Sequence, residues 1–362
     1  MGKRRRRFRP GPIRIAFMAT VGLALCAGVW TACARRASPP GARPPATAPS
    51  AAGHTPTSSS SSPAVRPVTS VRVRSLGALL PTPLMGLAAA TVGRHIYLVG
   101  GAGPQGYSAA IYAFTPPSAS AKARITKVAS LPAGRHDGAA VSSGGALLFC
   151  GGGRNRGHRA VYRYRPGGTV HLLGRMSQPL SDLAGVTAGG TAYCLGGYNG
   201  TSQYSAAVYA VGGATAARQV ATLPRPVRYA AAAAAGHGIL VVGGRTNGWR
   251  AVADIQWVPL RGGGKPVVVG SLPRPLYKAM GATLPGAALV IGGCGPHSHV
   301  HRHVYALSAS GAETGVGRLP TGWCYGAAAV LGGRVYVFGG HGPSGRPSDR
   351  VWELIPGQGA GG

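Results

Sequence analysis

The sequence predicts an all-β fold in which six four-stranded blades form a propeller. The chain has 362 residues, of which 61 are glycine, and glycine costs about 1 kcal/mol per helical position relative to alanine. Short apolar runs that end in a glycine pair recur at regular intervals. The pairs begin at Gly100, Gly151, Gly196, Gly243, Gly292 and Gly339, with spacings of 51, 45, 47, 49 and 47 residues. The glycine content argues against a helical bundle, and the spacing indicates a repeated sheet.

Other residues keep the same register as the glycine pairs. A leucine or methionine lies 20 residues before each pair, and a tyrosine or tryptophan follows 11 to 14 residues after it. The apolar run before each pair predicts a buried strand. An Ala/Gly-rich strand is expected before that run, most clearly at residues 230–235.

This double glycine with its spaced aromatic resembles the kelch repeat. The resemblance covers residues 68–362, or about 49 residues per unit, and kelch units of roughly 50 residues build four-stranded propeller blades. The tryptophan usual near the end of a kelch unit is mostly missing here, which leaves the subfamily open.

The two ends of the repeat region predict how the ring closes. The sixth unit stops soon after Trp352, so it lacks an outermost strand, and residues 71–80 end in Leu80-Pro81 at the offset expected for such a strand. We expect this N-terminal strand to pair with the last blade, because that pairing removes exposed sheet edges.

The N-terminal part predicts export. We expect a basic cytoplasmic head at 1–14, a transmembrane or signal segment at 15–34, a Pro/Ala/Ser-rich linker at 35–67 and the propeller at 68–362. Twenty uncharged residues can cross a bilayer as a helix, and the positive cluster before them stays inside. A retained anchor, a lipoprotein at Cys33 and free secretion after Ala34 remain alternatives. All three place the propeller outside the cytoplasm, with the membrane as one partner if the anchor is retained.

The charge is strongly positive throughout. The chain has 38 Lys and Arg against 6 Asp and Glu, a net charge of +32. Residues 68–362 keep 27 of these cations and all six acids, a net charge of +21. A GC-rich genome would explain the preference for arginine. The alternative is a surface that binds anionic partners.

One predicted ring of residues is a candidate site. Fourteen positions before each glycine pair, where the inner strand of each blade begins, the chain has Gly86, Asp137, Asp182, Tyr229, Lys278 and Tyr325. Six-fold repetition points these residues into one channel. They predict either a polar funnel for a small hydroxylated or charged molecule, such as a sugar, or a solvated pore lining.

The loops after the glycine pairs are expected on the same face. Compared with the Ala-rich remainder of the chain they concentrate aromatic, amide and guanidinium groups, which suit sugar stacking and hydrogen bonding to hydroxyls or anions. The candidates are Arg154, Asn155, Tyr198, Asn199, Asn247, Trp249 and Arg250. Ordinary polar loop composition is the alternative.

Two further features lie near the fifth glycine pair. His297, His299, His301 and His303 alternate as they would along one face of a strand, and grouped imidazoles can bind Zn, Cu or Ni. A solvated loop is the alternative, and no other cofactor is expected. Cys294 and Cys324 are expected on one face, where an oxidising compartment permits a disulfide.

We expect a monomeric binding module for envelope glycans, anionic polymers or a protein partner, with no specific nucleic-acid ligand. The alternative is a carbohydrate-active enzyme, because the kelch resemblance extends to galactose oxidase and sialic acid mutarotase. The copper ligands of the oxidase have no counterparts here. For a mutarotase-like or epimerase-like reaction, the acid–base candidates are Asp137, Asp182 and Lys278.

Overall fold

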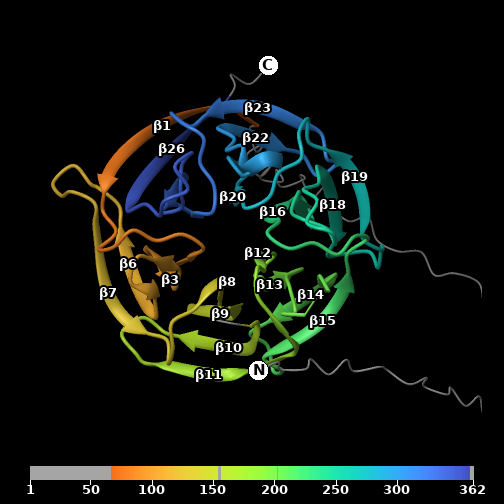
Figure 1. Cartoon of the computed structure of the whole chain (residues 1–362), viewed down its shortest axis with the longest axis horizontal. Helices are drawn as coiled ribbons and strands as arrows, with labels where there is room; N and C mark the ends of the chain where they lie inside the picture. Colours follow the sequence, from red (N-terminus) through yellow and green to blue (C-terminus); the bar gives the residue numbers. More distant parts are fainter. Residues whose placement is uncertain (1–66, 154–155, 202, 359–362) are drawn as a thin grey trace, which may run out of the picture. The chain divides into compact units, whose positions relative to one another are not determined.

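The computed structural model describes residues 67–153, 156–201 and 203–358, which form six four-stranded antiparallel sheets and one short hairpin. Viewed down the ring axis, the sheets stand around a common centre as the blades of a propeller (Figure 1). The predicted head and membrane segment lie outside the described residues, as does the linker apart from Pro67. Within the described ranges, no helix is long and apolar enough to cross a membrane.

Each of the first three blades is a continuous stretch of chain, and its strands run in order between channel and rim. Blade 1 contains β2 (Ala88–Val92), β3 (His95–Val99), β6 (Ala110–Thr115) and β7 (Arg124–Ser130). Its β3–β6 loop forms the hairpin of β4 (Ala102–Gly103) and β5 (Gly106–Tyr107). Blade 2 contains β8 (His136–Ser143), β9 (Ala146–Gly153), β10 (His158–Tyr164) and β11 (Val170–Leu180). Blade 3 contains β12 (Ala184–Ala188), β13 (Thr191–Leu195), β14 (Ala207–Val211) and β15 (Ala217–Thr222).

Blades 4 and 5 follow the same order, and blade 6 is built from both ends of the domain. Blade 4 contains β16 (Ala231–Ala235), β17 (Gly238–Val242), β18 (Asp254–Pro259) and β19 (Val267–Ser271). Blade 5 contains β20 (Met280–Leu284), β21 (Ala287–Ile291), β22 (His303–Leu307) and β23 (Glu313–Arg318), with the 3-10 turn η1 (Pro296–Ser298) before β22. Blade 6 contains β24 (Ala327–Leu331), β25 (Arg334–Phe338), β26 (Arg350–Gln358) and β1 (Val68–Ala78).

The N-terminal strand closes the ring as predicted. β1 pairs with β26 in antiparallel register, with Arg74 opposite Glu353. Both carboxylate oxygens of the fully buried Glu353 accept hydrogen bonds: Arg74 Nε donates at 2.7 Å, Arg334 Nη1 at 2.7 Å and Tyr336 Oη at 3.2 Å. The strand that completes the last blade is therefore held by an ion pair to a buried acid as well as by its backbone ladder.

The hydrophobic core lies between the blades. Among the described residues, six of the seven clusters of buried side chains each join two neighbouring sheets, and the seventh lies at the mouth of the channel. Where blade 6 meets blade 1, for example, Phe114 packs against Tyr336 and Phe338 with ring centroids 4.9 Å apart in both pairs. Neighbouring blades thus share one cluster, as in repeat proteins whose units bury their faces by stacking.

The glycine pairs are explained by contacts between blades. In the pair Gly243-Gly244 both residues have positive φ angles, 64° and 100°. A Cβ on Gly243 would overlap the carbonyl oxygen of Leu276 at the next blade, and Gly244 N–H donates to that same oxygen at 2.7 Å. Only glycine combines this conformation with so close a backbone approach, which is why the motif marks every repeat.

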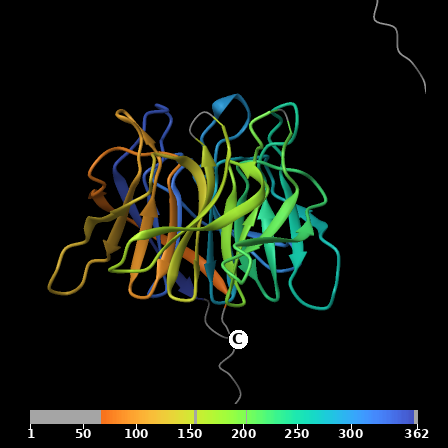
Figure 2. The same cartoon turned by 90° about the horizontal axis from the view of Figure 1, so that it is seen from below.

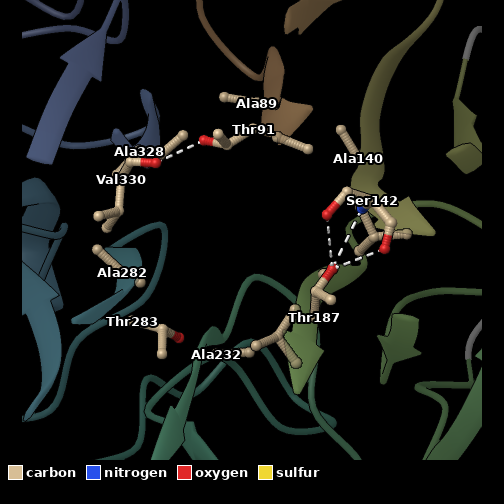
Figure 3. A pocket seen from close by; sticks show the side chains of 16 residues that line it. Ala89, Thr91, Ala140, Ser142, Thr187, Ala232, Ala282, Thr283, Ala328 and Val330 are labelled. Carbon is tan, nitrogen blue, oxygen red and sulfur yellow. Dashed lines mark hydrogen bonds between the residues drawn. The ribbon is translucent and has the colours of Figure 1, made fainter. Parts of the chain in front are cut away.

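Small side chains line the channel. The inner strands of all six blades contribute alanine, threonine, serine and valine around a cavity of about 170 Å³ (Figure 3). Thr91 donates to the carbonyl of Val330, and the hydroxyls of Ser142 and Thr187 lie 3.3 Å apart. Seen from the side, the loops gather at the two ends of the ring (Figure 2). The candidate site lies at the end where the chain enters each inner strand.

Candidate functional site

A closed ring of backbone hydrogen bonds surrounds one mouth of the channel. Each of the six residues that precede or begin an inner strand donates its N–H to the carbonyl of its counterpart in the preceding blade, at 2.6–3.0 Å. All six have φ between 55° and 64°, which is uncommon for residues other than glycine. The members are Gly86, Asp137, Asp182, Tyr229, Lys278 and Tyr325. The structure therefore brings the predicted ring residues together from all six blades.

The one glycine of the ring leaves space for its neighbours. A Cβ at Gly86 would lie 2.7 Å from Oδ1 of Asp137 and 3.1 Å from Cζ of Tyr325. The Asp137 carboxylate and the Tyr325 ring therefore occupy the volume that any other side chain would need. This makes the mouth asymmetric, with its acids on the side of blades 2 and 3.

Asp137 is the most heavily hydrogen-bonded group of the ring. Its Oδ2 accepts from Tyr325 Oη at 2.6 Å and Tyr229 Oη at 3.3 Å, and lies 2.7 Å from Nδ1 of His136. Burial alone would raise the pKa of this carboxyl, but the hydrogen bond and charge of His136, with those of Tyr325 and Lys278, hold it below its ordinary value. Burial also opposes the charge of His136, yet the contact with Asp137 raises the pKa of that imidazole. The structure thus favours an ionised Asp137 paired with a protonated His136.

Asp182 is the contrasting acid. Burial, followed by the charge of Asp137, raises its pKa to about 7, although Arg228 opposes the shift. Oδ2 of Asp182 lies 2.5 Å from Nη2 of Arg228 as an ion pair without hydrogen-bond alignment. Two neighbouring carboxyls in different environments therefore titrate far apart, and below pH 7 they carry one negative charge between them.

Lys278 faces these acids across aromatic rings. Its Nζ lies 3.4 Å from the ring centroid of Tyr325 and 4.8 Å from that of Tyr229. Burial lowers the pKa of this ammonium to about 8, although Asp137 and Asp182 favour its charged form. With Asp182, the mouth therefore holds two groups that titrate within about one unit of neutrality.

Two cavities meet at the ring. One of about 90 Å³ is lined by the ring residues themselves. The other, of about 270 Å³, lies among blades 2, 3 and 4, where His136, Arg156 and Arg228 are among its lining residues. Asp182 and Tyr229 line both cavities, so they connect the channel mouth with the space among the loops.

Arg228 is a candidate site residue that the sequence analysis did not predict, and four aromatic rings surround it. Its Cζ lies 4.4 Å from the centroid of Tyr198, 4.6 Å from Tyr229, 4.9 Å from Trp249 and 5.4 Å from Tyr204. Each such contact is worth about 0.5–2 kcal/mol, depending on desolvation. Arg228 immediately precedes the ring residue Tyr229, and alternation along an extended chain suggests that its side chain points away from the mouth, so the sequence carried no signal for it.

Trp249 is the most exposed large apolar side chain described. It is 62% exposed and has a φ of 63°, in the loop between β17 and β18. Arg245, a second missed residue, lies 5.2 Å from the Trp249 centroid and 3.8 Å from that of Tyr277. A strained backbone that holds an exposed indole beside two arginines is typical of a functional surface.

The other predicted loop residues have mixed placements. Asn199 Oδ1 accepts two hydrogen bonds from Thr201, so it stabilises its own loop. Asn247 and Arg250 are exposed. Arg154 and Asn155 lie outside the described residues. Of the predicted loop positions, Tyr198 and Trp249 are those that the structure joins to the ring, and both join it through Arg228.

The comparisons with known proteins agree with this architecture. The model of the Kelch motif matches residues 322–359, which run from the entry of blade 6 through β24, β25 and β26. The chain is a six-bladed propeller whose last blade matches the kelch motif. A solved structure titled "Structure of YjhT" aligns with a TM-score of 0.66 and 15% identity over 78% of this chain and 96% of that one, which shows the shared fold alone. No curated protein matches the sequence.

The His-rich loop of this propeller is not the extended strand that its alternating histidines predicted. Gly295 and Pro296 lead into η1, and His297 and Ser298 have left-handed φ angles of 53° and 59°. His299 and His301 lie with ring centroids 4.8 Å apart, whereas His303 stacks on Tyr305. The turn therefore separates imidazoles that a strand would align. That part of the prediction is wrong, and metal binding by these histidines stays untested.

Cys294 and Cys324 form a disulfide with a Cα separation of 5.7 Å. The bond links the blade 5 loop to the entry of blade 6, one residue before Tyr325 of the ring. Nε2 of His341 lies 3.4 Å from Sγ of Cys324. Within the described part of the chain, these three residues are the one group of three or more His, Cys, Asp or Glu side chains whose ligand atoms lie within 4.8 Å of one another, but the two sulfurs are bonded to each other and do not bind metals as thiolates. Cys150 and Cys194 are buried and free.

Proposed function

We propose that this kelch propeller is a binding module that holds a hydroxylated ligand, such as the end of a glycan chain, at the mouth formed by the ring. The observation that carries the proposal is the closed hydrogen-bonded ring, which brings two carboxyls, an ammonium and two phenols from five blades to one point. A rigid scaffold with a few convergent polar groups beside a cavity is the usual form of a ligand site.

The loops around the mouth support a sugar as the ligand. Trp249 offers an exposed ring, and Tyr107, 43% exposed, stacks on His136 with centroids 4.6 Å apart. Aromatic faces contact the C–H faces of sugars, while tyrosine and arginine donate hydrogen bonds to hydroxyls. We further propose that the N-terminal segment holds the propeller outside the cytoplasm, where envelope glycans, anionic polymers or a protein partner would meet it.

A glycan and polyanion array, probed with the purified full-length protein at low and raised salt, tests the proposal. We expect a narrow set of sugars whose binding survives salt, because contacts inside a cavity are poorly screened. Lys278→Met should weaken that binding, whereas Lys127→Met on the outer strand β7 removes the same charge away from the mouth and should not. Binding to every polyanion that disappears with salt would mean that charge alone acts, and binding to no glycan would reject the proposal.

The two carboxyls favour a second candidate, a proton-transfer enzyme that acts on sugars. Asp182 has a pKa of about 7 beside an ionised Asp137, and pairs of acids with separated pKa values often supply the acid and the base of a reaction. The test is to follow anomeric exchange of a bound sugar by NMR. Acceleration by the wild type that disappears in an Asp137→Asn/Lys278→Ala double variant would favour the enzyme. Binding without acceleration would favour the module.

A further inference from the structure

The cavity of about 270 Å³ among blades 2, 3 and 4 has an unbalanced charge. It is lined by His136, Arg156, Ser181, Asp182, Tyr198 and Arg228, among others, so its one acid faces three basic side chains. We propose that this cavity binds a carboxylated sugar of the hexuronate class and that binding is coupled to proton uptake by Asp182. This inference rests on the proposed function, because it names the ligand chemistry of the same face.

Arg228 supplies the argument for an anion. The residue is only 7% exposed, and its Nη2 is committed to Asp182 and to Oη of Tyr229 at 3.1 Å. Its Nε is buried with no hydrogen-bond partner among the described residues. An unsatisfied buried donor costs about 1–3 kcal/mol, and arginine binds carboxylates through a planar fork of donors. A ligand carboxylate beside Arg228 and the exposed Arg156 would remove that cost.

The walls and the size of the cavity supply the argument for a sugar. Tyr198 and Tyr229 contribute aromatic rings, and Ser181 contributes a hydroxyl. The cavity is somewhat smaller than the roughly 300 Å³ typical of the smallest drug-binding pockets. A single pyranose unit suits that volume better than a long oligosaccharide or a folded protein surface. The combination of aromatic faces, hydroxyl partners and excess positive charge is matched by one acidic sugar residue.

Asp182 supplies the link to pH. It faces Asp137 from β8, Arg228 and Tyr229 from the entry to blade 4, and His136 and Lys278 around the mouth. A ligand carboxylate would add a second negative charge near Asp182 and compete for Arg228, and both effects favour the protonated acid. Binding of the anion therefore takes up a proton, and affinity falls as pH rises through 7. His136 and Lys278 act in the same direction, since each loses positive charge as pH rises.

Calorimetric titration of the full-length protein with D-galacturonate and with D-galactose, at pH 6 and pH 8, tests the inference. We expect galacturonate to bind at least tenfold more tightly than galactose at pH 6, and its affinity to fall about tenfold by pH 8 if the protonated acid with a midpoint near 7 is required. Asp182→Asn should lose the part of the pH dependence that Asp182 causes, so at pH 8 it should bind galacturonate more tightly than the wild type does at pH 8. Arg156→Ala should weaken galacturonate binding, whereas Arg218→Ala on the exposed outer strand β15 should leave it unchanged.

The outcomes separate this inference from the proposed function. Equal affinity for the acidic and the neutral sugar, or an affinity that does not change with pH, would reject the inference while leaving a sugar-binding module intact. Absence of any carbohydrate binding would reject both. If Asp182→Asn does not fold, two measurements still test the inference. One compares Arg156→Ala with its control Arg218→Ala, and the other determines proton uptake on binding from titrations in buffers of different ionisation enthalpy.

Discussion

Removing the charge of Glu353 should weaken closure of the ring. This side chain is fully buried in β26 and is the one acid that links the N-terminal strand to its blade, through Arg74 on one side and Arg334 on the other. Glu353→Gln keeps the size of the side chain but replaces a doubly accepting carboxylate by an amide whose NH2 faces an arginine donor. The variant therefore tests closure with little change in packing.

The magnitude follows from the contacts. A hydrogen bond to a charged group is worth about 1.5–3 kcal/mol when buried, and Glu353 accepts two such bonds from arginine. Both arginine side chains are about half exposed, 52% and 46%, so water can replace part of what they lose. We therefore expect a loss of about 2–4 kcal/mol in the free energy of unfolding, below the 3–5 kcal/mol typical of a broken, fully buried pair.

Urea denaturation and hydrogen exchange of the β1 amides together measure the effect. The matched control is Glu313→Gln, because Glu313 is only partly buried at the start of β23 and surface changes usually cost less than about 0.5 kcal/mol. Faster exchange along residues 68–78 with a lower urea midpoint would support the reasoning. A Glu353→Gln protein as stable as the Glu313→Gln control, with unchanged β1 exchange, would refute it.

The same residue fixes the sign of one pH effect. Burial raises the pKa of Glu353, but Arg334 and Arg74 outweigh burial and hold the pKa below its ordinary value of 4.5. A depressed pKa in the folded state means that the stabilisation is fully present above pH 4.5 and is lost as pH falls through the folded pKa. Glu353→Gln should therefore show less acid destabilisation than the wild type.

Three further predictions concern the glycine pairs, the disulfide and the exposed indole. Gly243→Ala should lower the free energy of unfolding by about 3 kcal/mol or more. The control Gly248→Ala, with a similar φ of 79° but open space around it, should lose only the 1–2 kcal/mol typical of left-handed backbone. Equal urea midpoints for the two variants would contradict the overlap with the next blade. Replacing Cys294 and Cys324 together by serine should lower the free energy of unfolding by about 2–4 kcal/mol, because the disulfide closes a loop of 30 residues. A reductant should destabilise the wild type but not this double variant. If it destabilises both alike, loss of the disulfide is not the cause. Trp249→Ala should lower the melting temperature by a few degrees, because it removes two partly exposed cation–π contacts. It should also weaken sugar binding about tenfold, and unchanged binding would exclude the indole from the site.

The fold could be predicted because its most demanding positions admit few residue types. Both residues of each glycine pair have positive φ angles, and at the first of each pair a Cβ would overlap backbone from the next blade, so the repeat is visible as glycine. The strand that closes the ring was predictable for a similar reason, since a missing outermost strand at one end matched a surplus strand at the other.

The site could be predicted only where it follows the repeat. Asp137 and Asp182 were found because they lie in register with the repeat. Their partners His136 and Arg228 lie one position before a ring residue, and side-chain alternation along a strand predicts that they point away from the mouth. The His-rich loop failed because alternation was interpreted as a strand, although Gly295 and Pro296 turn the chain into η1. Perturbed pKa values could not be predicted at all, since they require the burial that only the assembled blades create.

The ring of six hydrogen bonds allows the side chains at the mouth to differ without a change in the backbone that holds them. The ring bonds use only backbone groups, and the left-handed conformation is the same for glycine, aspartate, tyrosine and lysine. Each of the five positions other than glycine therefore carries the strain of a left-handed backbone, roughly 1–2 kcal/mol per residue. This strain is the same whatever the side chain contacts. At Asp137 and Asp182 the contacts of the side chain offset this strain, so replacing either by glycine should destabilise the propeller through the buried partners that it leaves unpaired. Five of the six positions thus keep a side chain at a conformational cost that glycine would avoid, and the contacts of those side chains across the mouth are what offsets that cost.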